Sequence, residues 1–281
     1  MTVKTRARDS IVVFLIAFGL LGLFLWTGYL RLDNDALYAD VARGMVASGD
    51  WFNPQIYSVP FLDKPPFLYW LVGSSIRVLG ESSLSVRLTS AIFGALAVML
   101  VYLAATADRG LWTNPNERQR SLSEGRTPGL IAAAFLIGVP VFAEYSRRVY
   151  MEVPVSACVF ASIAYFDRAA ARLNAGKLDR SAFVLAGALT GAGFMFKSLV
   201  GLFGAIPSVL FMVIVLRRRV FSKAFVLGGG LALISFLAVV APWHVEQLLH
   251  QPEVFTEFTW KLHVEEQVLA AQPWSTGPPW F

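Results

Sequence analysis

Long apolar runs separated by short polar segments dominate the pattern of this chain. The apolar runs cover approximately residues 11–30, 87–107, 129–143, 153–170, 182–196, 199–216 and 224–242. Apolar runs of about 20 residues are typical of transmembrane helices. The hydrocarbon of a bilayer offers no hydrogen-bond partner to the backbone, so open loops and sheet edges cannot cross it. The pattern therefore predicts an all-α, polytopic membrane protein with about seven spans in one membrane domain, residues 1–281.

Two long polar segments interrupt or follow these runs, residues 31–86 and residues 243–281. Helical spacing within residues 35–47 places apolar side chains on one side of a helix and polar side chains on the other. The apolar side holds Leu37, Tyr38, Val41 and Met45, and the polar side holds Asp35, Asp40 and Arg43. This amphipathic pattern predicts a helix that lies in the membrane interface.

Composition supports the membrane interpretation and excludes several classes of site. The chain is 56% hydrophobic and 15% charged, with a mean hydropathy of +0.57, whereas soluble domains carry about 25% charged residues. A single cysteine, Cys158, allows neither an intramolecular disulfide nor a cysteine-based metal site, and we interpret it as a small core residue. The three histidines, His244, His250 and His263, match no metal-ligand spacing.

Basic residues indicate how the chain is oriented. With the N-terminus in the cytoplasm, 15 of the 24 Lys and Arg residues fall on the inner side and 9 fall outside, which agrees with the positive-inside rule. This orientation places residues 31–86 and 243–281 outside and predicts a multi-pass protein of the inner or plasma membrane. Residues 11–30 could be a signal peptide, but their length and the lack of a small-residue cleavage site favour a retained helix. Since the basic residues flank apolar runs, we predict no nucleic-acid partner.

Two charged clusters lie in the first outside segment, where acidic and basic groups near hydrocarbon are costly and therefore indicate function. Asp33-Asn34-Asp35 follows the first run and could serve chemistry, or could cap the interface helix and complement its dipole. Asp63-Lys64 precedes Pro65-Pro66 and a row of aromatic residues. The alternative interpretation of this second cluster is a turn with a solvated ion pair.

Two further groups of charged residues lie near the predicted outer ends of later spans. Arg147 and Arg148 lie in a short outside connection between Glu144 and Glu152, against the basic-inside trend. An anion such as a phosphate would explain these arginines, and so would a helical pair between Glu144 and Arg148. Lys197 lies alone between apolar runs. It could extend its ammonium to the interface or meet an anionic ligand there.

These segments together resemble the membrane glycosyltransferases of family 39, in the clan of ArnT and the protein O-mannosyltransferases. The resemblance rests on motifs in the family's order and spacing across nearly the whole chain. They are Asp35-Ala36-Leu37-Tyr38-Ala39-Asp40-Val41-Ala42-Arg43, Ser48-Gly49-Asp50-Trp51, Asp63-Lys64-Pro65-Pro66, Tyr69-Trp70, Val86-Arg87-Leu88, Glu152-Val153-Pro154, Phe196-Lys197 and Pro242-Trp243.

The resemblance implies a GT-C fold and transfer of a sugar from a polyprenyl-phosphate donor to a lipid, glycan or protein acceptor at the outer face. Direct displacement would invert the anomeric centre. A carboxylate would take the acceptor's proton, and cations would offset the charge on the leaving phosphate. Asp35 or Asp33 is the candidate base. The candidate phosphate ligands are Lys64, Lys197 and Arg148, while Asp63 and Glu152 would position the acceptor or a metal. The resemblance establishes no cofactor and leaves metal dependence open, with Asp35 and Glu152 as candidate ligands of a divalent metal ion.

This chain departs from the family pattern in ways that leave two alternatives open. The family usually has Asp-Glu where this chain has Asn34-Asp35, and it often has Glu-Lys-Pro and Asp-Met-Pro where this chain has Asp63-Lys64-Pro65 and Glu152-Val153-Pro154. Family members also continue for several more spans, so the resemblance implies a short or truncated member. One alternative is an inactive relative that acts as a binding or assembly partner. The other is a transporter, although no internal repeat is visible.

Overall fold

The computed structural model describes residues 3–28, 30, 34–57, 59–106 and 126–257. Its long helices are α1 (Val3–Gly22), α4 (Ser83–Ala105), α6 (Arg126–Gly138), α8 (Glu152–Asn174), α9 (Arg180–Lys197), α10 (Ala205–Leu216) and α11 (Lys223–His250). Shorter elements are the helices α2 (Asn34–Ser48), α3 (Phe67–Leu79), α7 (Pro140–Tyr145) and α12 (Pro252–Thr256), the 3-10 helices η1 (Ser198–Phe203) and η2 (Arg217–Phe221), and the antiparallel strands β1 (Gln55–Ile56) and β2 (Val59–Pro60).

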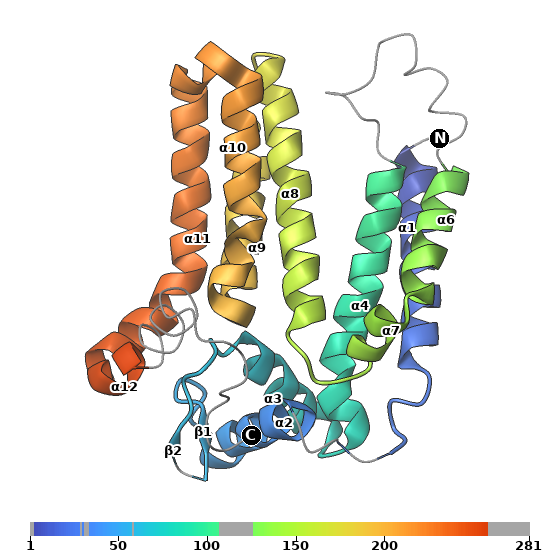
Figure 1. The fold of residues 1–281 in the computed structure, drawn as a ribbon, viewed down its shortest axis with the longest axis vertical. Coiled ribbons are helices and arrows are strands. Elements are labelled where there is room, and N and C mark those ends of the chain that lie inside the picture. Colours follow the sequence, from blue (N-terminus) through green and yellow to red (C-terminus); the bar gives the residue numbers. More distant parts are fainter. Residues whose placement is uncertain (1–2, 29, 31–33, 58, 107–125, 258–281) are drawn as a thin grey trace, which may run out of the picture.

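The long helices stand side by side in two groups, and a layer of short elements covers one end of them (Figure 1). One group contains α1, α4 and α6, and the other contains α8 to α11, with α4 packed against α8 between them. The layer contains α2, α3 and the β1–β2 hairpin, and α3 contacts both α4 and α9. This architecture confirms the predicted all-α membrane fold.

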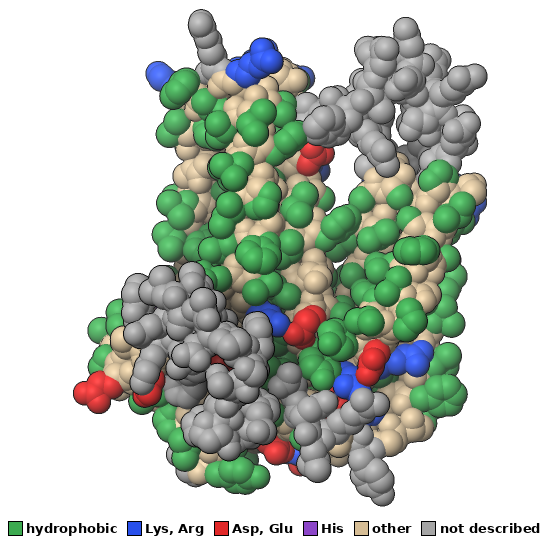
Figure 2. Space-filling model, in the orientation of Figure 1, with side chains coloured by type: hydrophobic (Ala, Val, Ile, Leu, Met, Phe, Trp, Pro, Cys, Tyr) green, Lys and Arg blue, Asp and Glu red, His purple; other side chains and the backbone are tan. Residues whose placement is uncertain are grey.

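Four of the described helical segments are long and apolar enough to cross a membrane on their own: α4, α8, α9 together with η1, and α11. The helices α3, α6 and α10 are apolar but shorter. Hydrophobic side chains cover most of the middle of the long helices on the face drawn in Figure 2, as contact with lipid requires. The count of seven spans and their boundaries stay predictions.

The first helix is displaced from the apolar run that predicts it. The run covers residues 11–30, but α1 begins at Val3 and ends at Gly22. Phe24 then has a φ of 65°, in the left-handed region that a right-handed helix cannot include. The backbone therefore turns at residues 23–28 although these residues are still largely apolar.

The helix expected to begin near Asp35 is confirmed as α2. Its side chains Tyr38, Val41 and Met45 are buried in a core that also includes Phe196 of α9. Leu37 is half-buried and packs against the same core. The expectation that Asp35 faces the polar side is wrong, since this side chain is only 1% exposed. The reason is that its carboxylate finds partners in two other segments, which a helical wheel does not contain.

The packing of α9 on α11 depends on a glycine. A Cβ atom built on Gly187 would lie 2.0 Å from the carbonyl oxygen of Ala232, whereas one built on Gly230 would meet no atom within 4 Å. We expect Gly187→Ala to lower the free energy of unfolding by about 1–3 kcal/mol, because the helices must separate. Gly230→Ala should be neutral or stabilising by up to about 1 kcal/mol. Thermal unfolding of the purified protein checks this, and equal effects of both variants would contradict the close approach.

The predicted orientation places the α2–α3 layer outside and the opposite ends of the long helices in the cytoplasm. Accordingly, an impermeant thiol reagent should label Gln55→Cys in intact cells and should label Arg120→Cys only after lysis. The native Cys158 is buried and should give little background. Labelling of residue 120 but not residue 55 in intact cells would reverse the topology.

Candidate functional site

An ion pair links the beginning of α8 to the end of α9. Glu152 is the first residue of α8 and Lys197 is the last residue of α9. The Lys197 ammonium donates to the Glu152 carboxylate at 2.6 Å, and the side chains are 31% and 37% exposed. The chain turns sharply after Lys197, where Ser198 has a φ of 44° before η1 begins. This turn ends α9 at the level of the α2–α3 layer, so a cation and a carboxylate meet there with part of each still open to solvent.

Asp35 occupies a buried position in the first turn of α2. Its Oδ1 accepts a hydrogen bond of 2.5 Å from the backbone N–H of Val149, and its Oδ2 lies 3.8 Å from the Arg87 guanidinium. Arg87 also donates to the carbonyl oxygens of Thr27 at 2.9 Å and Leu25 at 3.4 Å. Asp35 therefore joins α2 to α4 and to the segment that leads into Glu152.

A second ion pair lies before α3. The Lys64 ammonium donates to the Asp63 carboxylate at 2.9 Å, and the side chains are 14% and 30% exposed. The following Pro65-Pro66 precedes α3, whose first residue is Phe67. A proline fixes its own backbone angle close to the helical value and lacks the N–H that a helix start leaves unpaired. The two prolines therefore position Asp63 and Lys64 just before the first turn of α3, and packing of the buried face of α3 fixes the place of this helix.

Two tyrosines connect these pairs. Burial, with the negative charges of Asp63 and Glu152, raises the pKa of Tyr38 far above its usual range. Burial and the nearby Tyr38 and Asp63 raise the pKa of Tyr69 as well. The rings of the two tyrosines are 5.8 Å apart. Both hydroxyls therefore stay protonated at neutral pH, and that of Tyr69 is buried without a hydrogen-bond partner in the described part of the chain.

Arg148 lies in the connection between α7 and α8 and is engaged by neighbours. Its guanidinium is 2.9 Å from the Glu144 carboxylate, four residues earlier. It also donates to the Tyr150 hydroxyl at 3.3 Å and lies over that ring. Arg147 points elsewhere and donates to the carbonyl of Leu20 at the end of α1. The Glu144–Arg148 ion pair of the alternative interpretation is thus observed, although Arg148 lies beyond the end of α7, and phosphate binding by Arg148 stays a prediction.

The structure brings most of the predicted residues to one end of the long helices. Glu152 and Lys197 are in direct contact, and so are Asp63 and Lys64. Tyr38 lies close to both carboxylates, and Asp35 is one turn before Tyr38 in α2. A common cavity for these side chains stays a prediction. Asp33 lies outside the described residues.

A metal site is not formed by the described residues. They contain no group of three His, Cys, Asp or Glu side chains placed to hold a metal ion. The oxygens of Asp35 are directed to Val149 and Arg87, and Glu152 is paired with Lys197. Asp35 and Glu152 thus do not fit the role of joint metal ligands.

Arg87 belongs to a family motif, but sequence reasoning missed its pairing with Asp35. It is 9% exposed and lies at the start of α4. The cost of a charge near hydrocarbon could have identified it, since Arg87 begins the second apolar run. Its pairing with Asp35 spans 52 positions and depends on tertiary packing, so no local pattern indicates it.

Comparison with known proteins shows what the chain as a whole is similar to. A family model described as dolichyl-phosphate-mannose-protein mannosyltransferase matches residues 119–243. Two relatives are named undecaprenyl phosphate-alpha-4-amino-4-deoxy-L-arabinose arabinosyl transferase. The relative from Pseudomonas savastanoi pv. phaseolicola is 27% identical over 99% of this chain and 48% of its own length. The relative from Pectobacterium atrosepticum is 28% identical over 93% of this chain and 44% of its own.

A solved structure shows the same fold. The crystal structure of ArnT from Cupriavidus metallidurans bound to undecaprenyl phosphate aligns with a TM-score of 0.69 at 21% identity, over 94% of this chain and 45% of that protein. The chain therefore spans about half the length of the relatives it matches. These matches do not favour the transporter or the inactive-partner alternative.

Proposed function

We propose that the chain is a GT-C membrane glycosyltransferase that transfers a sugar from a polyprenyl-phosphate donor to an acceptor at the outer face of the membrane. The relatives' names suggest a 4-amino-4-deoxy-pentose on undecaprenyl phosphate as the first donor to test. The acceptor is a lipid, glycan or protein. The N-terminus is cytoplasmic in this proposal, and the α2–α3 layer lies outside.

The observation that carries the proposal is the partly exposed ion pair of Lys197 and Glu152 beside the α2–α3 layer. An ammonium has three N–H donors, and Glu152 is the partner that the described residues provide for Lys197. Two N–H groups can therefore donate to phosphate oxygens of the donor. As the bond from the sugar carbon to the phosphate breaks, charge grows on the leaving phosphate, and a fixed cation stabilises it. Lys64 and Arg148 are further candidates for this role.

A carboxylate must take the proton of the acceptor as the new glycosidic bond forms. A base has to lie within hydrogen-bond reach of that proton. Asp63 and Glu152 are the partly exposed carboxylates of the site, and they suit acceptor binding. The protonated hydroxyls of Tyr38 and Tyr69 can bind sugar oxygens. The unpartnered hydroxyl of Tyr69 in particular would gain the hydrogen bond that a buried polar group needs.

Asp35 is the base that the resemblance implies, with Asp33 as the other candidate. Its carboxylate is buried and bonded to Val149, so action as a base requires the acceptor to reach it. The same bonds give Asp35 a positioning role, because they hold the segment that leads into Glu152. Asp35→Asn separates these roles. If this variant loses transfer but still binds the donor, Asp35 acts as a base. If it retains most transfer, Asp35 has only the positioning role.

The decisive experiment uses the purified chain in liposomes. Undecaprenyl phosphate carrying the radiolabelled 4-amino-4-deoxy-pentose is added with lipid A, a glycan or a peptide as acceptor. Transfer of label to one acceptor, with release of undecaprenyl phosphate, supports the proposal. Binding of the donor without turnover on any acceptor would instead support the inactive relative. If the chain neither binds the donor nor turns it over, the proposed function is overturned for this chain.

A further inference from the structure

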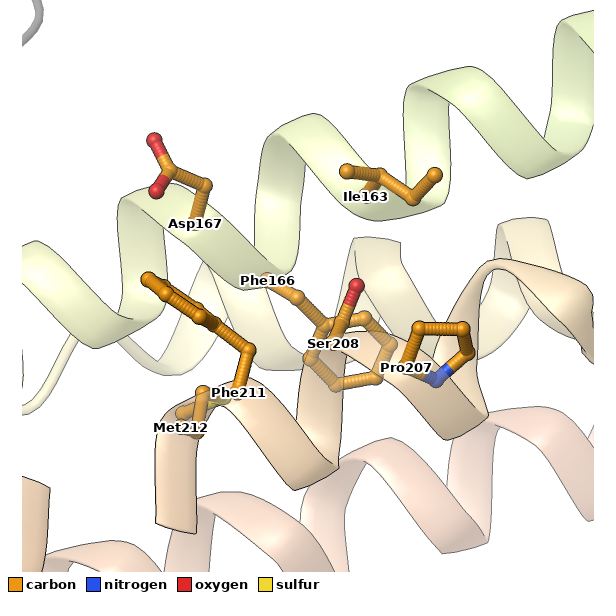
Figure 3. Close-up of a pocket in the computed structure, with 7 residues that line it drawn as sticks. All are labelled: Ile163, Phe166, Asp167, Pro207, Ser208, Phe211 and Met212. Carbon is orange, nitrogen blue, oxygen red and sulfur yellow. The ribbon is translucent and has the colours of Figure 1, made fainter. Parts of the chain in front are cut away.

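A pocket lies between α8 and α10, away from the α2–α3 layer. It is a pocket of about 300 Å³ on the side of the long helices. Figure 3 shows side chains from the two helices facing each other across it. The pocket is lined mainly by Ile163, Phe166 and Asp167 of α8 and by Pro207, Phe211 and Met212 of α10.

The pocket is apolar except for one carboxylate and one hydroxyl. The hydroxyl of Ser208 donates to the carbonyl of Gly204 at 2.6 Å, so its proton is already used. Asp167 has no ion pair or hydrogen bond to the part of the chain that the structure describes. Its carboxylate and the ring of Phe211 lie at one end of the pocket, and Ile163 and Pro207 lie toward the other (Figure 3). The pocket therefore has a negative end and an apolar end.

Asp167 lies close to the end of α8 that is opposite Glu152. The next residue, Arg168, pairs with Asp179 in the connection between α8 and α9 at 2.9 Å. Asp167 is seven residues before the end of α8, which corresponds to about 10 Å along the helix. In the predicted topology this is the cytoplasmic end of α8, so the carboxylate would lie near the membrane boundary there. A negative charge close to hydrocarbon is costly without a partner.

We propose that this pocket binds a membrane lipid with an ammonium headgroup. The ammonium would pair with the Asp167 carboxylate, and the acyl chains would lie along Ile163, Phe166 and Pro207. The argument is charge complementarity, since the described residues leave this carboxylate unpaired, together with a continuous apolar surface leading away from it. Access from the bilayer is supported by α10, where the apolar side chains Ile206 and Leu210 are more than half exposed.

Native mass spectrometry of the purified full chain tests the proposal with phosphatidylethanolamine and phosphatidylglycerol of the same acyl chains. We expect retained adducts of phosphatidylethanolamine, with at least about tenfold weaker retention of phosphatidylglycerol, as for loss of a charged hydrogen-bonded partner. Asp167→Asn should remove this preference, and Asp167→Glu should keep it. Glu253→Gln, which removes an acidic charge in α12, is the matched control and should change nothing.

Other outcomes would overturn the proposal. Equal retention of both lipids, or a preference that survives Asp167→Asn, would show that the carboxylate does not select the headgroup. A change of oligomeric mass in Asp167→Asn would indicate that a second copy of the chain covers the pocket instead. Ile163→Trp provides an independent measurement, since filling the apolar end should reduce retention of phosphatidylethanolamine while Asp167 is intact.

Discussion

Replacing Lys197 by Met should reduce sugar transfer by about 10²- to 10³-fold, the usual cost of removing one group that stabilises a developing oxyanion. Methionine keeps much of the length and apolar character of the side chain, so α9 should still pack. Donor binding should weaken as well, because the ammonium would contact the phosphate before and during the reaction. Transfer and the dissociation constant for the undecaprenyl-phosphate donor are measured together on the purified chain.

Two further variants make the result specific. Lys177→Met removes a lysine from the exposed connection between α8 and α9, at the opposite end of these helices, and should leave transfer unchanged. Glu152→Gln frees Lys197 from its carboxylate partner, so donor binding should tighten even if transfer falls. Weaker donor binding in Glu152→Gln, or normal binding in Lys197→Met, would contradict competition between Glu152 and phosphate for the same ammonium.

Replacing Asp35 by Ala should lower the free energy of unfolding by about 3–5 kcal/mol, because it removes one partner of a buried charge pair and leaves the other buried. The affected partner is Arg87, whose side chain is 11% exposed. The variant also leaves the N–H of Val149 without its acceptor. Asp35→Asn should cost less, since an amide oxygen can still accept from Val149. Thermal and denaturant unfolding in detergent give the comparison.

A double variant separates loss of the partner from loss of the side chain itself. Arg87→Met combined with Asp35→Ala removes both charges, so much of the lost stability should return. Asp40→Ala in the same helix is the control, since Asp40 pairs with the half-exposed Arg43 and should cost less than about 1 kcal/mol. If Asp35→Ala is as stable as Asp40→Ala, the Asp35–Arg87 contact is not a structural link.

Periodicity predicts much of this fold because lipid and backbone chemistry allow few solutions. The apolar runs that gave the spans coincide broadly with α4, α8, α9 and α11, and the amphipathic pattern after Asp35 gave α2. Element ends were less predictable. The helix α1 ends at Gly22 within an apolar run, two residues before the left-handed residue Phe24. The 3-10 helix η1 separates α9 from α10 where the sequence shows only the isolated Lys197.

The sequence selected the charged residues of the candidate site but did not predict how they pair. The cost of charge near hydrocarbon selected Asp63, Lys64, Glu152 and Lys197 because each lies near an outer end of an apolar segment. That argument cannot tell which carboxylate meets which cation. Helical spacing placed Asp35 on the polar side of α2, because the partners that bury it, Arg87 and Val149, lie far along the chain and are brought to α2 only by packing.

Hydrogen bonds connect the C-terminal end of α11 to the turn before β1, and this connection has a mechanical consequence. Trp243 and Gln247 both donate to the carbonyl of Phe52, at 2.9 and 2.8 Å, and Gln251 donates to Asn53 at 2.7 Å. The tilt of a long membrane helix responds to the thickness of the bilayer. A change in the tilt of α11 would therefore pull on the turn at Phe52, which Trp70 of α3 also holds through the carbonyl of Trp51. We therefore expect a change in bilayer thickness to reach the layer that carries Asp63 and Lys64 even if no lipid touches either residue.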